Sequence, residues 1–109
     1  RAKCAESLAE AFGLKAQKDE LFLMGLFSVL DVILEKPMAE ALKVVHVAGE
    51  ISNALIYRIG VLAPVYDFML QYETANWAEV SRLMLLKNID MNTVYEAYTS
   101  ALKWYRTVR

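Results

Sequence analysis

The sequence predicts an all-α protein, a compact bundle of about six to seven helices. Apolar residues recur every three or four positions along most of the chain, as in helices with one buried face. There is no sustained alternation of apolar and polar residues and no Asn-Gly or Asp-Gly hairpin turn, so no strand competes with this prediction. The 109 residues are enough for one domain and not for two.

The first predicted helix covers about residues 1–12, with apolar residues on one face. Gly13 is well placed to end it, because glycine adopts the left-handed conformation without a Cβ clash. No capping residue precedes the helix, so we expect the chain to be part of a longer protein. Residues 15–19 form a short polar connection to the next helix.

The second predicted helix covers about residues 20–35 and is apolar almost all round, which places it in the centre of the bundle. Its exceptions are Gly25, Ser28 and Asp31, which form a narrow stripe where another helix can approach closely. Asp31 has two interpretations. It is either a catalytic or ligand-gripping acid, or a structural acid that bonds a neighbouring helix end or faces solvent.

The remaining helices are separated by recognisable start and stop signals. Gly60 ends one helix, and Asn76 with Glu79 resembles a capping box that starts the next. Asp90 or Asn92 caps the last helix. The expected ranges are about 37–45, 49–59, 63–74 and 77–87, followed by the last helix after its cap.

Aromatic residues are dense in the C-terminal half. Tyr72 lies just before the predicted capping box, and Trp77 lies within it. The last helix has an apolar face, made of Val94, Tyr95, Tyr98, Leu102 and Tyr105, with Trp104 beside it. Such residues serve either as core and interface packing or as a platform for stacking nucleobases. Their helical spacing favours packing.

Composition restricts the partners. The formal net charge is -1 with both signs mixed, whereas proteins that bind nucleic acid or anionic membranes usually carry a basic surplus. The longest apolar stretch, residues 21–34, falls short of the roughly 20 residues that cross a bilayer, so no membrane span is expected. The chain is nevertheless 57% hydrophobic, against about 45–50% in average soluble domains. We therefore expect a protein partner: a second copy, or another part of the same protein.

The residues that usually carry chemistry are scarce. His46 is the only histidine and Cys4 the only cysteine, so no metal-ligand set is visible. His46 follows two valines and is interpreted as a packing or capping residue. A single cysteine forms no internal disulfide, which favours a reducing, cytoplasmic setting. Ser28 lies inside an apolar helix, and no glycine-rich phosphate loop is present. The sequence predicts no catalytic residue, no metal site and no cofactor.

Several segments resemble HDOD domains, the HD-related output domains of bacterial signalling proteins. They are the helix FLMGLFSVLDVIL, the Pro37 segment, the helix ISNALI, the turn from Tyr72 to Trp77, and the terminal aromatic helix. The version most similar is the one C-terminal to an EAL domain in cyclic-di-GMP-related proteins. The resemblance covers the whole chain and implies that residues 1–109 are the C-terminal part of a larger HDOD module, with an HD-domain/PDEase-like helix arrangement.

The resemblance also bears on activity. HD phosphohydrolases carry an adjacent His-Asp pair of metal ligands where this helix reads Ser28-Val29. The implied function is a non-catalytic regulatory or protein-interaction module. Its expected partners are an upstream EAL domain, the remaining HDOD half, or a second copy. The letters Glu40-Ala41-Leu42 lie in a short amphipathic helix and are interpreted as chance, not as an EAL catalytic motif.

Two alternatives remain at this point. One is a degenerate HD-type phosphohydrolase or nucleotide-binding domain, with Asp31 and His46 in the site. The other is a plain helical adaptor unrelated to HD domains. For the leading hypothesis, the candidate interaction or structural positions are Ser28, Asp31, Tyr72 and Trp77.

Overall fold

The computed structural model describes residues 1–46 and 49–108, and the predicted all-α fold is confirmed. Within these ranges the chain forms helices joined by turns, and no strand is present. The elements in order are α1 (Ala2–Leu8), the 3-10 turn η1 (Lys15–Gln17), α2 (Lys18–Phe27), α3 (Leu30–Leu34), α4 (Met38–Val44), α5 (Gly49–Ser52), the π-helical turn η2 (Asn53–Tyr57), α6 (Ala63–Glu73), α7 (Trp77–Lys87) and α8 (Met91–Val108).

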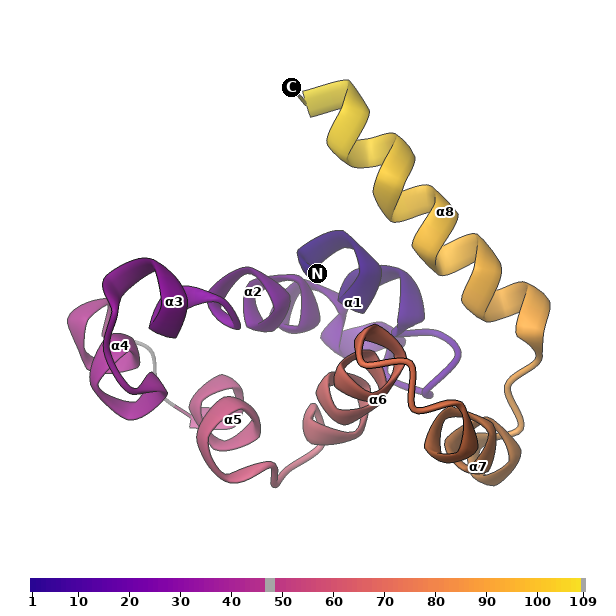
Figure 1. Ribbon diagram of the computed structural model, residues 1–109, viewed down its shortest axis with the longest axis horizontal. Helices are drawn as coiled ribbons and strands as arrows, with labels where there is room; N and C mark the ends of the chain where they lie inside the picture. The colour runs from indigo at the N-terminus through magenta and orange to yellow at the C-terminus, as the bar shows by residue number, and fades with distance from the viewer. Residues whose placement is uncertain (47–48, 109) are drawn as a thin grey trace.

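The short helix α1 is the centre of the bundle, in contact with α2, α6 and α8 (Figure 1). Ala5 and Leu8 are both 0% exposed, so α1 is enclosed by its neighbours. Phe68 and Met69 of α6 and Val94 of α8 complete the centre of the core. We call α1, α2, α6 and α8 the core unit.

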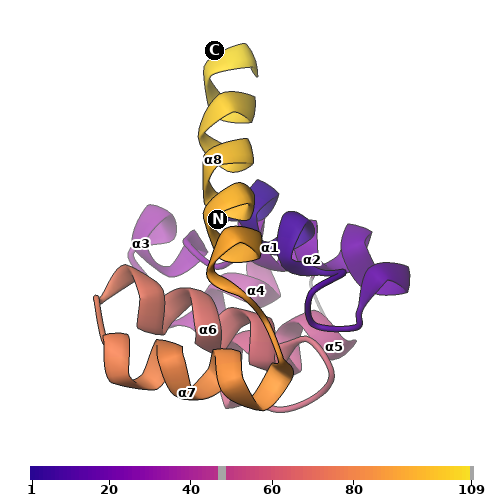
Figure 2. The same cartoon turned by 90° about the vertical axis from the view of Figure 1, so that its right-hand side faces the viewer.

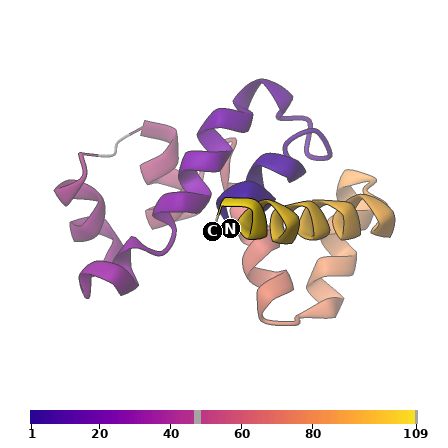
Figure 3. The same ribbon diagram turned by 90° about the horizontal axis from the view of Figure 1, so that it is seen from above.

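The helices α3, α4 and α5 with η2 form an arm that extends away from α1 (Figure 1). Seen from above, the arm and the N-terminal end of α8 lie at opposite ends of the molecule (Figure 3). The helices α6 and α7 run side by side, and α8 rises from them toward its free end (Figure 2).

The predicted helix over residues 20–35 is two helices, α2 and α3, with a break at Ser28 and Val29. The hydroxyl of Ser28 donates a hydrogen bond to the carbonyl of Gly25, 2.6 Å away. A serine that bonds its own helix backbone competes with the backbone ladder and bends the helix. The second half of the predicted helix is also not central, since Val32 is 74% and Ile33 is 65% exposed.

Gly25 lies where α1 crosses α2, and this part of the predicted close approach is confirmed. A Cβ atom at Gly25 would lie 2.6 Å from the Cα of Ala2 and from the carbonyl oxygen of Arg1. Only glycine allows two backbones to come this close.

Other predicted boundaries shift by local turns. The first helix ends at Leu8, and Gly13, at a φ of 71°, ends the turns that follow. The predicted helix 49–59 becomes α5 and the π-helical η2, and Arg58 in the left-handed region ends it instead of Gly60. The predicted caps hold at α7, where the Glu79 N–H donates to Asn76 Oδ1, and at α8, where Asp90 is the capping residue.

The predicted apolar face of the last helix is only partly buried. The buried side of α8 consists of Val94, Ala97 and Ala101, which are at most 6% exposed. Tyr95 and Leu102 are 68% and 63% exposed, so they lie outside the core. The helix therefore turns its small residues toward α1 and leaves larger ones in solvent.

Candidate protein-interaction surfaces

Ser28 is a buried junction residue between α2 and α3, only 3% exposed. Besides its bond to Gly25, its hydroxyl accepts a hydrogen bond from Nη1 of Arg1 at 3.3 Å. The same Nη1 donates to the Ser28 carbonyl at 3.4 Å. The hydroxyl is thus engaged in holding the helix break in place.

Arg1 links this junction to the end of α6. Its Nε lies 3.0 Å from Oε1 of Glu73, and both side chains are partly exposed. One guanidinium therefore connects Ser28 and Glu73, which are 45 positions apart in the sequence (28 and 73). Nothing in the sequence pattern indicates this contact, because it depends on how α1 is packed.

Tyr72 is the middle member of an aromatic ladder that runs from the core to the surface. Its ring stacks on Tyr98 of α8 with a centroid distance of 4.1 Å and an interplanar angle of 17°. Trp77 meets Tyr72 edge-on at 5.3 Å, and Trp77 is 55% exposed. On the inner side, Phe68 stacks on Tyr72 at 6.5 Å. The structure thus brings Tyr72 and Trp77 together, and adds Tyr98 to them.

A groove of about 240 Å³ lies beside this ladder, between α8, the end of α6 and the start of α1. Its lining is mainly apolar: Arg1, Cys4, Met69, Glu73, Tyr98, Ala101, Leu102 and Tyr105. Burial raises the pKa of the Cys4 thiol to about 11, so at neutral pH it is a protonated thiol and not a nucleophile. Burial also raises the pKa of Tyr98. The groove suits an apolar side chain better than a reaction.

An apolar stripe continues from the groove along α8. Met91, Tyr95, Leu102 and Tyr105 are 60%, 68%, 63% and 38% exposed, and Tyr98 lies among them half-buried. We call these five residues the α8 stripe. Exposed apolar side chains gathered along one side of a helix are typical of interaction surfaces.

The arm carries a second set of exposed apolar residues. Val32 and Ile33 lie on α3, and Val44 and Val45 lie at the end of α4, 54% and 38% exposed. We call these four residues the arm patch. Leu30 of α3 packs against the core, but Val32 and Ile33 are exposed and therefore do little to stabilise the chain by itself.

Asp31 and His46 are not part of either surface. Asp31 lies in the first turn of α3, and its Oδ1 accepts a hydrogen bond from the Val32 N–H at 2.9 Å. His46 follows α4, is exposed, and has a φ of 57°. Among the described residues no group of three or more His, Cys, Asp or Glu side chains is placed to hold a metal ion. In the same part of the chain, no helix has the length and apolar character needed to cross a membrane.

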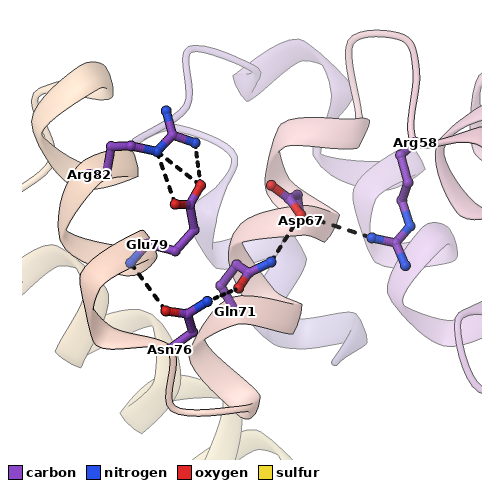
Figure 4. Close-up of polar contacts among 6 residues, drawn as sticks. All are labelled: Arg58, Asp67, Gln71, Asn76, Glu79 and Arg82. Carbon is purple, nitrogen blue, oxygen red and sulfur yellow. Dashed lines mark hydrogen bonds and ion pairs between the residues drawn. The ribbon is translucent and has the colours of Figure 1, made fainter.

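A chain of polar contacts fixes the neighbouring α6–α7 turn (Figure 4). Gln71 donates to Asp67 at 3.5 Å and accepts from Asn76 at 2.9 Å, and Asp67 lies 3.9 Å from Arg58. Glu79 forms an ion pair with Arg82, which lowers the pKa of the Glu79 carboxyl. These residues fix the position of Trp77 at the start of α7. The capping box predicted Asn76 and Glu79, but not the other members.

Comparisons with known proteins place the chain beside two longer proteins. It is 28% identical over 108 residues, 99% of the chain, to the cyclic di-GMP phosphodiesterase CdgJ of Vibrio cholerae. It is 28% identical over 104 residues, 95% of the chain, to the uncharacterized protein YuxH of Bacillus subtilis. The chain spans about a quarter of the length of both relatives. No family model and no solved structure matches it.

Proposed function

We propose that this chain is a non-catalytic regulatory, protein-interaction module of bacterial cyclic-di-GMP signalling, of the HDOD type and associated with an EAL domain. The similarity to CdgJ over nearly the whole chain supports the signalling context. The similarity of segments such as FLMGLFSVLDVIL and ISNALI to HDOD domains supports the HDOD assignment. The buried, backbone-bonded Ser28 supports a structural role at the position where an HD enzyme carries its His-Asp pair.

The arm patch is the observation that carries this proposal. Val32 and Ile33 are more than three-fifths exposed, at 74% and 65%, although both are large aliphatic residues. Burying an aliphatic side chain of this size contributes about 1.5–3 kcal/mol. The matched segment is a quarter of CdgJ, so its counterparts in that protein have further chain available to cover them. We propose that residues 1–109 form the C-terminal part of a larger HDOD module whose remaining part covers the arm patch.

The proposal gives each candidate position a role. Ser28 holds the α2–α3 break that turns α3 outward, and Asp31 stabilises the first turn of α3 through the Val32 N–H. Tyr72 and Trp77 connect the core to the surface beside α8. None of the four acts on a substrate in this proposal.

A chimera tests the arm patch. The matched quarter of CdgJ is replaced by this chain, and the soluble yield, thermal stability and phosphodiesterase activity of the chimera are measured. Changing Val32 and Ile33 together to Asp should lower the yield and stability of the chimera while leaving the isolated chain folded. The matched control is Leu85→Asp with Leu86→Asp, two exposed leucines on α7 (84% and 66%) outside the arm. Equal behaviour of the two double variants would contradict the proposal.

The isolated chain tests the non-catalytic part. Incubation with cyclic di-GMP and Mg²⁺ or Mn²⁺ should leave the dinucleotide intact, and neither metal nor dinucleotide should raise the melting temperature, because a ligand stabilises only what it binds. Hydrolysis that is lost in Asp31→Asn or His46→Ala would instead favour the degenerate phosphohydrolase.

A further inference from the structure

The α8 stripe has the spacing of a coiled-coil seam. Its members, at positions 91, 95, 98, 102 and 105, follow one another at intervals of four, three, four and three residues. This is the heptad pattern of about 3.5 residues per turn, in which apolar positions form one seam along a helix. The pattern spans two heptads and covers most of α8, which runs from Met91 to Val108.

Met91, Tyr95 and Leu102 of the stripe are largely exposed in a single chain. The hydroxyl of Tyr105 accepts a hydrogen bond from the N-terminal amine of Arg1 at 3.1 Å, and its side chain is still 38% exposed. The helix packs on α1 through Val94, Ala97 and Ala101, which are buried. Only Tyr98 of the stripe is half-buried, through its stack on Tyr72. One side of α8 therefore holds it in the bundle, and the adjacent side presents large apolar residues to solvent.

Charge is unevenly distributed along α8. The acidic residue Asp90 caps the start of α8 and Glu96 lies in its first half, whereas the second half carries the basic residues Lys103 and Arg106. All four are exposed. Within the described residues, Glu96 and Arg106 form no intramolecular ion pair, so both charges are available to a partner.

We infer that two copies of this chain associate through their α8 stripes in antiparallel orientation. A pairing centred near Ser100 places Tyr95 opposite Tyr105 of the second copy, and Tyr98 opposite its Leu102. Glu96 then lies beside Arg106 of the second copy, and two-fold symmetry repeats this contact. A parallel pairing would instead leave Glu96 ten positions along the seam from Arg106 of the second copy, so this contact would be absent.

This interface is separate from the surface used in the proposed function. The arm patch lies on the opposite side of α1 from the N-terminal part of α8 (Figure 3). A module can use its arm for the rest of its own protein and its α8 stripe for a second copy. Each idea can therefore fail without the other.

Sedimentation velocity over a range of concentrations tests the dimer. The wild-type chain should form a dimer, and Leu102→Glu should raise its dissociation constant about tenfold or more, since it places a charge near the centre of an apolar seam. The matched control is Leu85→Glu, the same change at an 84% exposed leucine of α7. It should leave the dissociation constant unchanged. Circular dichroism confirms that both variants remain helical.

Charge reversal tests the orientation. Glu96→Arg and Arg106→Glu should each weaken the dimer about threefold, and the double variant should restore wild-type affinity, since surface ion pairs have effects of this size. A strictly monomeric wild-type chain would overturn the inference. So would a dimer that Leu102→Glu leaves intact, or single charge variants whose effects simply add.

Discussion

The core unit and the arm are built from similar apolar sequences, yet they bury them very differently. In the core unit, Leu8, Leu21 and Phe68 are 0% exposed. In the arm, α4 and η2 bury a few residues such as Leu42 and Leu55, whereas α3 and α5 contain no buried residue. Large aliphatic side chains of the arm such as Val32 remain in solvent. The difference shows that apolar content alone does not decide burial. A helix is buried only where neighbours surround it, as α2, α6 and α8 surround α1.

The largest expected effect comes from truncating one aromatic residue in each region. Phe68→Ala should lower the free energy of unfolding by about 3–5 kcal/mol, because the buried ring also contacts Phe12 and Tyr72 and leaves a cavity. Tyr57→Ala, at a 66% exposed aromatic residue of the arm, should change it by less than about 0.5 kcal/mol. Urea unfolding of both variants measures the comparison. Similar losses would mean that the arm is as well packed as the core.

A second pair of variants replaces a small residue by valine in each region. Gly25→Val should destabilise the chain by about 1–3 kcal/mol, because its side chain would meet the α1 backbone. The matched change in the arm is Ala39→Val, at an exposed position of α4, which should cost about 0.5 kcal/mol through helix propensity. Thermal unfolding distinguishes the two. A Gly25 variant as stable as the Ala39 variant would show that α1 can move away from α2.

The thiol of Cys4 makes the core unit sensitive to alkali. Burial raises the pKa of Cys4 from its ordinary value of 9.0 to about 11. Because the folded pKa lies above the unfolded one, the stabilisation is complete below about pH 9 and is lost as pH rises to about 11. The loss should amount to about 2–3 kcal/mol. Cys4→Ala should lack this part of the decline when unfolding is measured from pH 8 to 11. Parallel profiles of wild type and variant would contradict the prediction.

The smallest expected effect concerns the start of α8. The Thr93 N–H and hydroxyl donate to Asp90, and they hold the pKa of its carboxyl below the ordinary value of 3.8. A lowered folded pKa stabilises the helix above the unfolded pKa, and this is lost as pH falls through the folded pKa. Asp90→Asn keeps a capping oxygen without the charge. Its melting temperature should fall less than that of the wild type between pH 5 and pH 2.5. An unchanged acid profile would argue against this cap.

Local signals predicted much of the fold. Asn76 with Glu79 predicted the start of α7, and Asp90 was one of two residues predicted to cap α8, because a cap is formed by residues three positions apart. The apolar spacing predicted α6 almost to the residue, with 63–74 expected and Ala63–Glu73 observed. The break at Ser28 was missed, since nothing in the apolar pattern marks it.

For the candidate positions too, contacts within one turn could be predicted from the sequence, and contacts between distant segments could not. Tyr72 and Trp77 were predicted as neighbours of one turn, and they do meet. Their contact with Tyr98, and the link from Arg1 to both Ser28 and Glu73, join residues far apart in the chain and carry no local signal. Whether Ser28, Asp31, Tyr72 and Trp77 bind a partner stays a prediction.

The sequence by itself determined the all-α class, the cap of α7 and an excess of apolar residues, and it narrowed the cap of α8 to two residues. Each depends on side chains a few positions apart, whose interactions follow from helix geometry. Only the tertiary structure decided which apolar helix is central, because burial depends on what surrounds a helix and not on its own composition. It placed the short α1 in the middle, and it left Val32 and Ile33 of α3 and most of the α8 stripe in solvent.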